Sequence, residues 1–112
     1  MERIMSAIII LTNAPDRVIA RRIADALIER KLAACVNMLA ECTSIYRWKG
    51  KVETATEVPM LIKTRADIYD DVEAAIRSLH PYELPEIIAV PVGRGSSDFL
   101  DWVNAQTVTA TV

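Results

Sequence analysis

The sequence predicts a single α+β domain in which strands and helices follow one another as β-α-β-β-α-β-α. Runs of β-branched and long aliphatic residues, the first over residues 4–12, are typical of buried strands. Apolar residues spaced i, i+3, i+4, i+7 over residues 15–31 and 68–79 indicate amphipathic helices. A length of 112 residues suits one domain, which we assign to the whole of residues 1–112.

The same two patterns place the remaining elements. The predicted strands cover residues 4–12, 32–39, 43–48, 51–64 and 87–92, and the predicted helices cover 15–31, 68–79 and 99–105. Pro15 and Asp16 suit the first turn of the first helix, because a fixed φ and a negative charge are favoured there. The pattern predicts a bulge at residues 40–41, and it predicts that Lys49 and Gly50 form the turn of a long hairpin.

The second half of the chain carries its own start and stop signals. Thr64 with Asp67 resembles a capping box for the second helix, which should end before Pro81. Pro59 is expected at an edge or bulge position of its strand. Ser96 or Ser97 caps the last helix, and residues 107–112 form either a frayed end or a short extra strand.

Two β-α-β units joined by a hairpin give the ferredoxin-like split β-α-β sandwich, here with an extended central hairpin and a short C-terminal helix. Hairpin arms of roughly 15 residues at about 3.3 Å per residue span close to 50 Å. A globule of this chain length is only about 34 Å across. We therefore expect the ribbon to overhang and pair with neighbouring copies of the chain, which would shelter Tyr46 and Trp48. The alternative is a bend at residues 40–41 that folds the ribbon over its own sheet.

Composition excludes several classes of function. The hydrophobic content of 52% excludes a disordered chain. A net charge of −2 gives no electrostatic footprint for nucleic acid, and no apolar run approaches the roughly 20 residues of a membrane-spanning helix. We expect no secretory signal and a cytoplasmic location, with Cys35 and Cys42 as reduced thiols.

The residues also lack the motifs of an enzyme. There is a single histidine, no G-x-S-x-G, no phosphate-binding loop and no dinucleotide fingerprint, so we predict a non-enzymatic protein without an organic cofactor. The densest polar cluster is residues 80–86, which two prolines stiffen. Within it, His80 and Glu86 are candidate ligands of a divalent cation such as Cu(II). The alternative for His80 is an interaction with the dipole at the end of the preceding helix.

A second hypothesis is that polar and aromatic residues line a ligand cleft between subunits. Its candidate members are Lys63, Trp48, Tyr82 and Glu83, which could meet a small anion. The alternatives are plainer: Lys63 extends its ammonium group from a strand end into water, and Trp48 packs in an interface.

Several segments of the sequence together resemble the CutA family, the divalent-cation tolerance proteins. The segments that carry the resemblance are NAPD at 13–16, KLAACVN at 31–37, TSIYRWKGK at 43–51, LIKT at 61–64, HPYELPEII at 80–88 and DFLDW at 98–102. The resemblance implies a ferredoxin-like subunit in a tight homotrimer, similar in plan to the PII signalling proteins. It also implies a cytoplasmic location, association with divalent copper and a link to metal tolerance.

The family's copper-binding pattern is only partly present. It has a cysteine late in the first strand and two histidines before Pro-Tyr, where this chain has Thr12 and the pair Leu79–His80. We therefore expect a non-enzymatic homotrimer of metal response that binds Cu(II) or another divalent cation weakly through His80 and Glu86. Two alternatives are a PII-like trimer that binds a small anion between subunits and an assembly module without a ligand.

Overall fold

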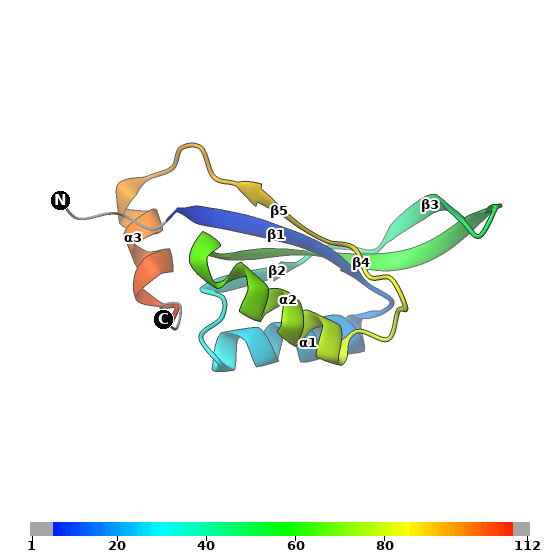
Figure 1. The fold of residues 1–112 in the computed structure, drawn as a ribbon, viewed down its shortest axis with the longest axis horizontal. Helices are drawn as coiled ribbons and strands as arrows, with labels where there is room; N and C mark the ends of the chain where they lie inside the picture. The colour runs from blue at the N-terminus through cyan, green and yellow to red at the C-terminus, as the bar shows by residue number, and fades with distance from the viewer. Residues whose placement is uncertain (1–5, 109–112) are drawn as a thin grey trace.

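The computed structural model describes residues 6–108, and its elements follow the predicted order (Figure 1). The strands are β1 (Ala7–Ala14), β2 (Cys35–Met38), β3 (Cys42–Trp48), β4 (Lys51–Arg65) and β5 (Ile87–Pro91). The helices are α1 (Arg17–Glu29), α2 (Tyr69–Leu79), which follows a 3₁₀ turn at Ala66–Ile68, and α3 (Ser97–Ala105). None of these helices has the length and apolar character needed to cross a membrane. Of the predicted tail at 107–112, residues 109–112 lie outside the described residues.

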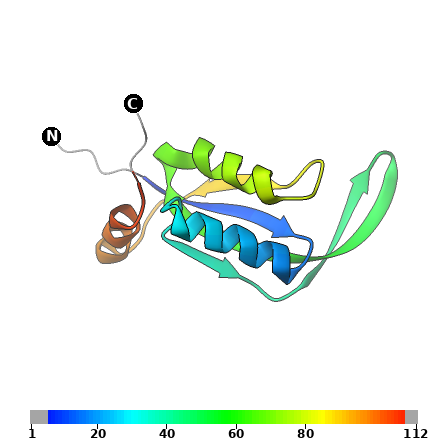
Figure 2. The ribbon, with the colours of Figure 1, turned by 90° about the horizontal axis from the view of Figure 1, so that it is seen from below.

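The five strands form one antiparallel sheet. Its order is β2-β4-β1-β5, and β3 continues the pairing along the outer half of β4. Helices α1 and α2 lie side by side on one face, and α3 packs at the end of the sheet (Figure 2). The core lies between the sheet and the helix pair, where Ile10, Ile23, Ile62 and Ile76 are fully buried. The predicted α+β class, with both long helices on one face, is confirmed.

Helix α1 is shorter than predicted at both ends. Asp16 is its N-cap rather than a first-turn residue, and its Oδ1 accepts a hydrogen bond of 2.8 Å from the Ile19 N–H. The C-terminus closes at Glu29 because Lys31 adopts a left-handed φ of 57°. The Leu32 N–H then reaches back 2.9 Å to the Leu27 carbonyl, which is a Schellman closure.

The predicted capping box at Thr64 is wrong. Thr64 lies within β4, and its buried hydroxyl donates a 2.6 Å hydrogen bond to the Leu32 carbonyl. A 3₁₀ turn leads into α2 instead. Beside it, the Arg65 guanidinium donates two hydrogen bonds, of 3.0 and 2.9 Å, to the Asp67 carboxylate. At the third helix the prediction of a serine cap is confirmed, since the Phe99 N–H donates to Ser96 Oγ.

The hairpin of β3 and β4 overhangs the domain, as the length argument predicts. The chain measures 52 × 25 × 25 Å, and the ribbon extends beyond both helices (Figure 1). Lys49 and Gly50 turn it with φ of 50° and 82°, the pair of positive values that a tight two-residue hairpin turn requires. The ribbon does not fold over its own sheet. It curls sideways, and its tip approaches the loop between α2 and β5 (Figure 2).

Pro59 marks the interruption between the two shorter strands. The Leu39 N–H donates to the Pro59 carbonyl at 2.9 Å, after β2 has ended and before β3 begins. Because N–H and C=O of one strand residue point the same way, the missing Pro59 donor faces the interruption and costs no ladder hydrogen bond. The long strand β4 therefore remains continuous across the break.

Candidate functional site

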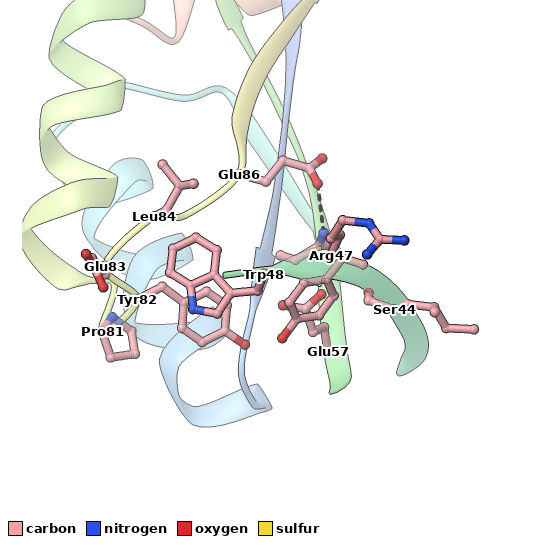
Figure 3. Close-up of a pocket in the computed structure, with 12 residues that line it drawn as sticks. Ser44, Arg47, Trp48, Glu57, Pro81, Tyr82, Glu83, Leu84 and Glu86 are labelled. Atoms are coloured by element: carbon pink, nitrogen blue, oxygen red, sulfur yellow. Dashed lines mark hydrogen bonds between the residues drawn. The ribbon is translucent and has the colours of Figure 1, made fainter. Parts of the chain in front are cut away.

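The ribbon and the loop between α2 and β5 line an open pocket of about 750 Å³, called the ribbon pocket below (Figure 3). One wall is β3 over residues 44–48, and the opposite wall is the loop over residues 81–86. Asn13 at the end of β1 and Glu57 of β4 complete the lining. Of the residues predicted for a site, Trp48, Tyr82, Glu83 and Glu86 meet here.

His80 lies under the loop that forms this wall. It is only 8% exposed, and its Nε2 lies 2.7 Å from the Asn13 carbonyl oxygen. Its Nδ1 accepts a 3.2 Å hydrogen bond from the Tyr82 N–H. Since a carbonyl can only accept and an amide N–H can only donate, the imidazole proton belongs on Nε2. Both ring nitrogens are thus used to attach the loop to β1 and to orient Tyr82, whose ring centroid is 4.6 Å from that of His80.

Tyr82 and Glu57 both line the ribbon pocket and lie next to each other. Burial of the phenol raises the pKa of Tyr82 to about 12, and the neighbouring Glu57 carboxylate acts in the same direction. Tyr82 therefore stays a neutral hydrogen-bond donor facing a carboxylate. Glu57 itself is 7% exposed, and no basic side chain among residues 6–108 makes an ion pair with it.

The rim of the ribbon pocket already holds an ammonium group. Lys49 Nζ lies 5.5 Å from the centroid of the Trp48 ring and 4.0 Å from Glu83 Oε1. This arrangement combines a cation–π contact with an exposed ion pair, each weak in water. It lies where the tip of the ribbon approaches the loop.

Glu86 lies at the opposite side of the loop from Glu83 (Figure 3). Its Oε1 accepts a 3.3 Å hydrogen bond from Asn13 Nδ2, so Asn13 contacts the loop twice, through its backbone and its side chain. Glu86 is exposed.

Lys63 is not part of the ribbon pocket. It lies six residues from Glu57 along β4, about 20 Å at 3.3 Å per residue. Its Nζ donates a 2.8 Å hydrogen bond to Asn37 Oδ1, and it borders a separate small cavity beside α3. Within one chain, Lys63 therefore lies apart from the other residues predicted for the cleft between subunits.

Asn13 and Glu57 were not predicted from the sequence as members of a site. Both are contributed by strands whose apolar pattern gives no sign of a site, and only the register of β1, β3 and β4 brings them to the loop. One signal was present for Glu57: it is a carboxylate directly before the most apolar part of β4.

A metal centre does not fit one copy of the chain. Over residues 6–108, no three side chains of His, Cys, Asp or Glu come close enough together to hold an ion. His80 could bind a metal only by giving up one of its two hydrogen bonds. The lining of the ribbon pocket has three carboxylates, at Glu57, Glu83 and Glu86, against the single guanidinium of Arg47. It is therefore suited to a positive charge.

Fold and site together define the class: a ferredoxin-like α+β protein whose overhanging ribbon closes a carboxylate-lined pocket against a proline-stiffened loop. The profile of the CutA1 divalent ion tolerance protein family matches residues 8–106. The chain therefore belongs to this family, and the resemblance stated from the sequence is confirmed.

Comparisons with individual relatives support the same family. The chain is 41% identical over 99 residues to the divalent-cation tolerance protein CutA of Thermus thermophilus, covering 88% of this chain and 96% of that protein. It is 46% identical over 95 residues to the mouse protein CutA, with 85% of this chain matched. The match covers 54% of the mouse protein, so the chain spans about half of that relative's length. The crystal structure of CutA1 from Oryza sativa has a TM-score of 0.90 at 35% identity, covering 93% of this chain and 95% of that chain.

Proposed function

We propose that this chain acts in divalent-cation tolerance as a non-enzymatic, cytoplasmic homotrimer that binds Cu(II) or a similar ion weakly. The tolerance role follows from family membership. The trimer is the assembly that the family resemblance implies, and one structural observation supports association: an apolar face of the sheet that the chain itself leaves uncovered.

The uncovered face lies opposite α1 and α2. Ile10 and Ile62 point into the core, so their neighbours Leu11 and Leu61 point to the other side. The register places Ile88 of the edge strand β5 beside Leu11, which makes a row of three aliphatic side chains across β5, β1 and β4. Ile88 is 51% exposed in the isolated chain. An apolar row of this kind, ending at an open strand edge, favours association with other copies of the chain.

The location in the cytoplasm is supported by the two cysteines. Cys35 and Cys42 are free thiols, and the β4 residues that lie opposite them in the sheet are six positions apart. That spacing of about 20 Å is far beyond the reach of a disulfide. The thiols fit a reducing compartment.

Metal binding is supported by the charge of the ribbon pocket, which favours a cation over the small anion of the alternative hypothesis. The donors from one chain are too few for a tight site, so we propose weak binding. Glu86 supplies a carboxylate oxygen, His80 supplies Nδ1 after releasing the Tyr82 N–H, and any further donors come from a neighbouring copy.

Assembly is tested by placing a charge on the uncovered face. Ile88→Lys should shift the mass of the particle, measured by light scattering after gel filtration, from trimer to monomer. Val18→Lys is the matched control, because Val18 is 67% exposed on α1 away from that face. Equal masses for the two variants would rule out this face as the interface.

Metal binding is tested by isothermal titration with Cu(II). Glu86→Gln and His80→Gln should each reduce the heat of binding, while Glu41→Gln, an exposed carboxylate outside the ribbon pocket, should leave it unchanged. If all four proteins give the same titration, the assignment of His80 and Glu86 as ligands is wrong.

A further inference from the structure

We propose that Glu57 of one copy of the chain forms an ion pair with Lys63 of a neighbouring copy, and that this pair joins the copies of the trimer. The inference rests on the assembly proposed above and deepens it, because it names the two side chains that the contact brings together. It requires neither a metal nor a small-molecule ligand. Three features carry it: a buried acid, an unpaired base and the distribution of charge on the uncovered face.

The first feature is the burial of Glu57 without a counter-charge from its own chain. Only 7% of this residue is exposed, and a buried carboxylate is costly unless an opposite charge or several hydrogen bonds compensate for it. The Tyr82 phenol faces it as a neutral donor, and no Lys or Arg among residues 6–108 lies within ion-pair distance. One chain alone thus leaves this charge uncompensated, at the base of the ribbon where the proposed trimer places a neighbouring copy.

The second feature is an ammonium group without a carboxylate partner. Lys63 Nζ donates a 2.8 Å hydrogen bond to Asn37 Oδ1, and in the described part of the chain no acidic side chain makes an ion pair with it. An ammonium group has three N–H donors, so two remain after this bond. The neutral amide holds the ammonium group in place without neutralising it. Lys63 can therefore donate to a carboxylate of another copy.

The third feature is the distribution of charge on the uncovered face. Side chains alternate along β4, and the even-numbered residues of 58–62 are buried in the core. Glu57, Leu61 and Lys63 therefore share the face opposite α1 and α2. The apolar row through Leu61 lies between the acid at the ribbon end and the base at the end beside α3. About 20 Å of strand separates the two charges, too far for a pair within one chain.

A ring of three copies can bring these two ends together. Every contact in a ring with three-fold symmetry is head-to-tail, so a patch on one copy meets a different patch on the next copy. The acid end of one face therefore does not meet another acid end, and the base end carries the complementary charge. Contacts that match opposite charges are favoured over contacts that bring like charges together. The pair forms three times in the ring, once at each contact.

Arg94 is the other basic residue at this end of the sheet, and it borders the same small cavity as Lys63. It lies in the exposed loop between β5 and α3, whereas Lys63 is half-buried on β4 and is held by Asn37. A side chain that is already held in place loses less conformational entropy when it forms an ion pair. The geometry therefore favours Lys63, and Arg94 provides the matched control.

The test is sedimentation equilibrium of the full-length protein over a dilution series, in a urea concentration that half dissociates the wild-type trimer. The single variants are Glu57→Gln, Lys63→Met and Arg94→Met, and the double variants combine Glu57→Gln with each of the other two. Glutamine and methionine are close in length to the side chains that they replace. Circular dichroism in the absence of urea checks that every variant folds.

We expect Glu57→Gln and Lys63→Met each to raise the protein concentration of half dissociation at least tenfold, because each leaves the opposite charge unpaired in the contact. The double variant of these two should dissociate no more readily than either single variant, since neither charge remains. Arg94→Met should have no effect, alone or combined with Glu57→Gln.

The outcomes separate the pair from the assembly. A wild type that is monomeric without urea overturns both. A trimeric wild type overturns the pair alone if Glu57→Gln or Lys63→Met has no effect, or if their effects add in the double variant. Coupling of Glu57 to Arg94 in place of Lys63 overturns it as well.

Discussion

Replacing His80 by alanine should destabilise the chain in the absence of any metal. The substitution removes the 2.7 Å hydrogen bond to the Asn13 carbonyl and the 3.2 Å hydrogen bond from the Tyr82 N–H. Each is worth about 1 kcal/mol, and a buried acceptor left without a donor costs about 1–3 kcal/mol. For the Asn13 carbonyl this penalty replaces the 1 kcal/mol of the lost bond, so with about 1 kcal/mol for the bond from Tyr82 the free energy of unfolding should fall by about 2–4 kcal/mol.

The assay is equilibrium unfolding in urea with EDTA, at one fixed protein concentration because association contributes to stability. His80→Gln is the informative comparison, since its amide can donate through nitrogen and accept through oxygen. It should lose only about 1 kcal/mol. If His80→Ala unfolds at the same urea concentration as the wild type, the imidazole does not attach the loop to β1, and its role as a positioning residue is refuted.

Three further predictions concern the core, the ribbon and the pocket. Thr12 Oγ1 is buried and has no hydrogen-bond partner among residues 6–108, so Thr12→Val should stabilise the chain by about 1 kcal/mol. Thr64→Val should instead cost about 1–3 kcal/mol, because it leaves the Leu32 carbonyl without its donor. Thermal unfolding of both variants checks these opposite signs. Gly50→Ala should lower stability by about 1–2 kcal/mol because φ is +82° there, while Gly93→Ala, with open space and no positive φ, should be nearly neutral in the same measurement. The pKa of Tyr82 is raised to about 12 in the folded chain from 10.0, so its contribution to stability is complete below pH 10 and is lost as the pH rises toward 12. Urea midpoints measured across that range should fall more steeply for the wild type than for Tyr82→Phe, and parallel curves would contradict the assignment.

The fold was largely predictable because its signals are local. Apolar periodicity marks α1 and α2, and Pro81 ends α2 where expected: the preceding His80 has an extended ψ of 130°. The long ribbon followed from simple length arithmetic. The capping prediction failed because a local signal competed with a long-range contact. Thr64 has the chemistry of a helix cap, but its hydroxyl is satisfied by a carbonyl more than thirty residues earlier in the chain.

The site was less predictable because it depends on register and curvature. Trp48 reaches the loop only because the ribbon curls, and neither apolar alternation nor turn residues specify that curl. Glu57 enters the pocket through the pairing of β3 with β4, which places it opposite Cys42 at the base of the ribbon. Lys63 is a residue type that often binds ligands, but it lies on the same strand as Glu57 at the end away from the ribbon pocket.

The central claim is that the overhanging ribbon and the uncovered sheet face serve association with other copies of the chain. Sedimentation equilibrium of the wild-type protein at micromolar concentration tests it most directly. We predict a single species of about three times the 12.5 kDa chain mass. A fully folded particle of 12.5 kDa under these conditions would contradict it.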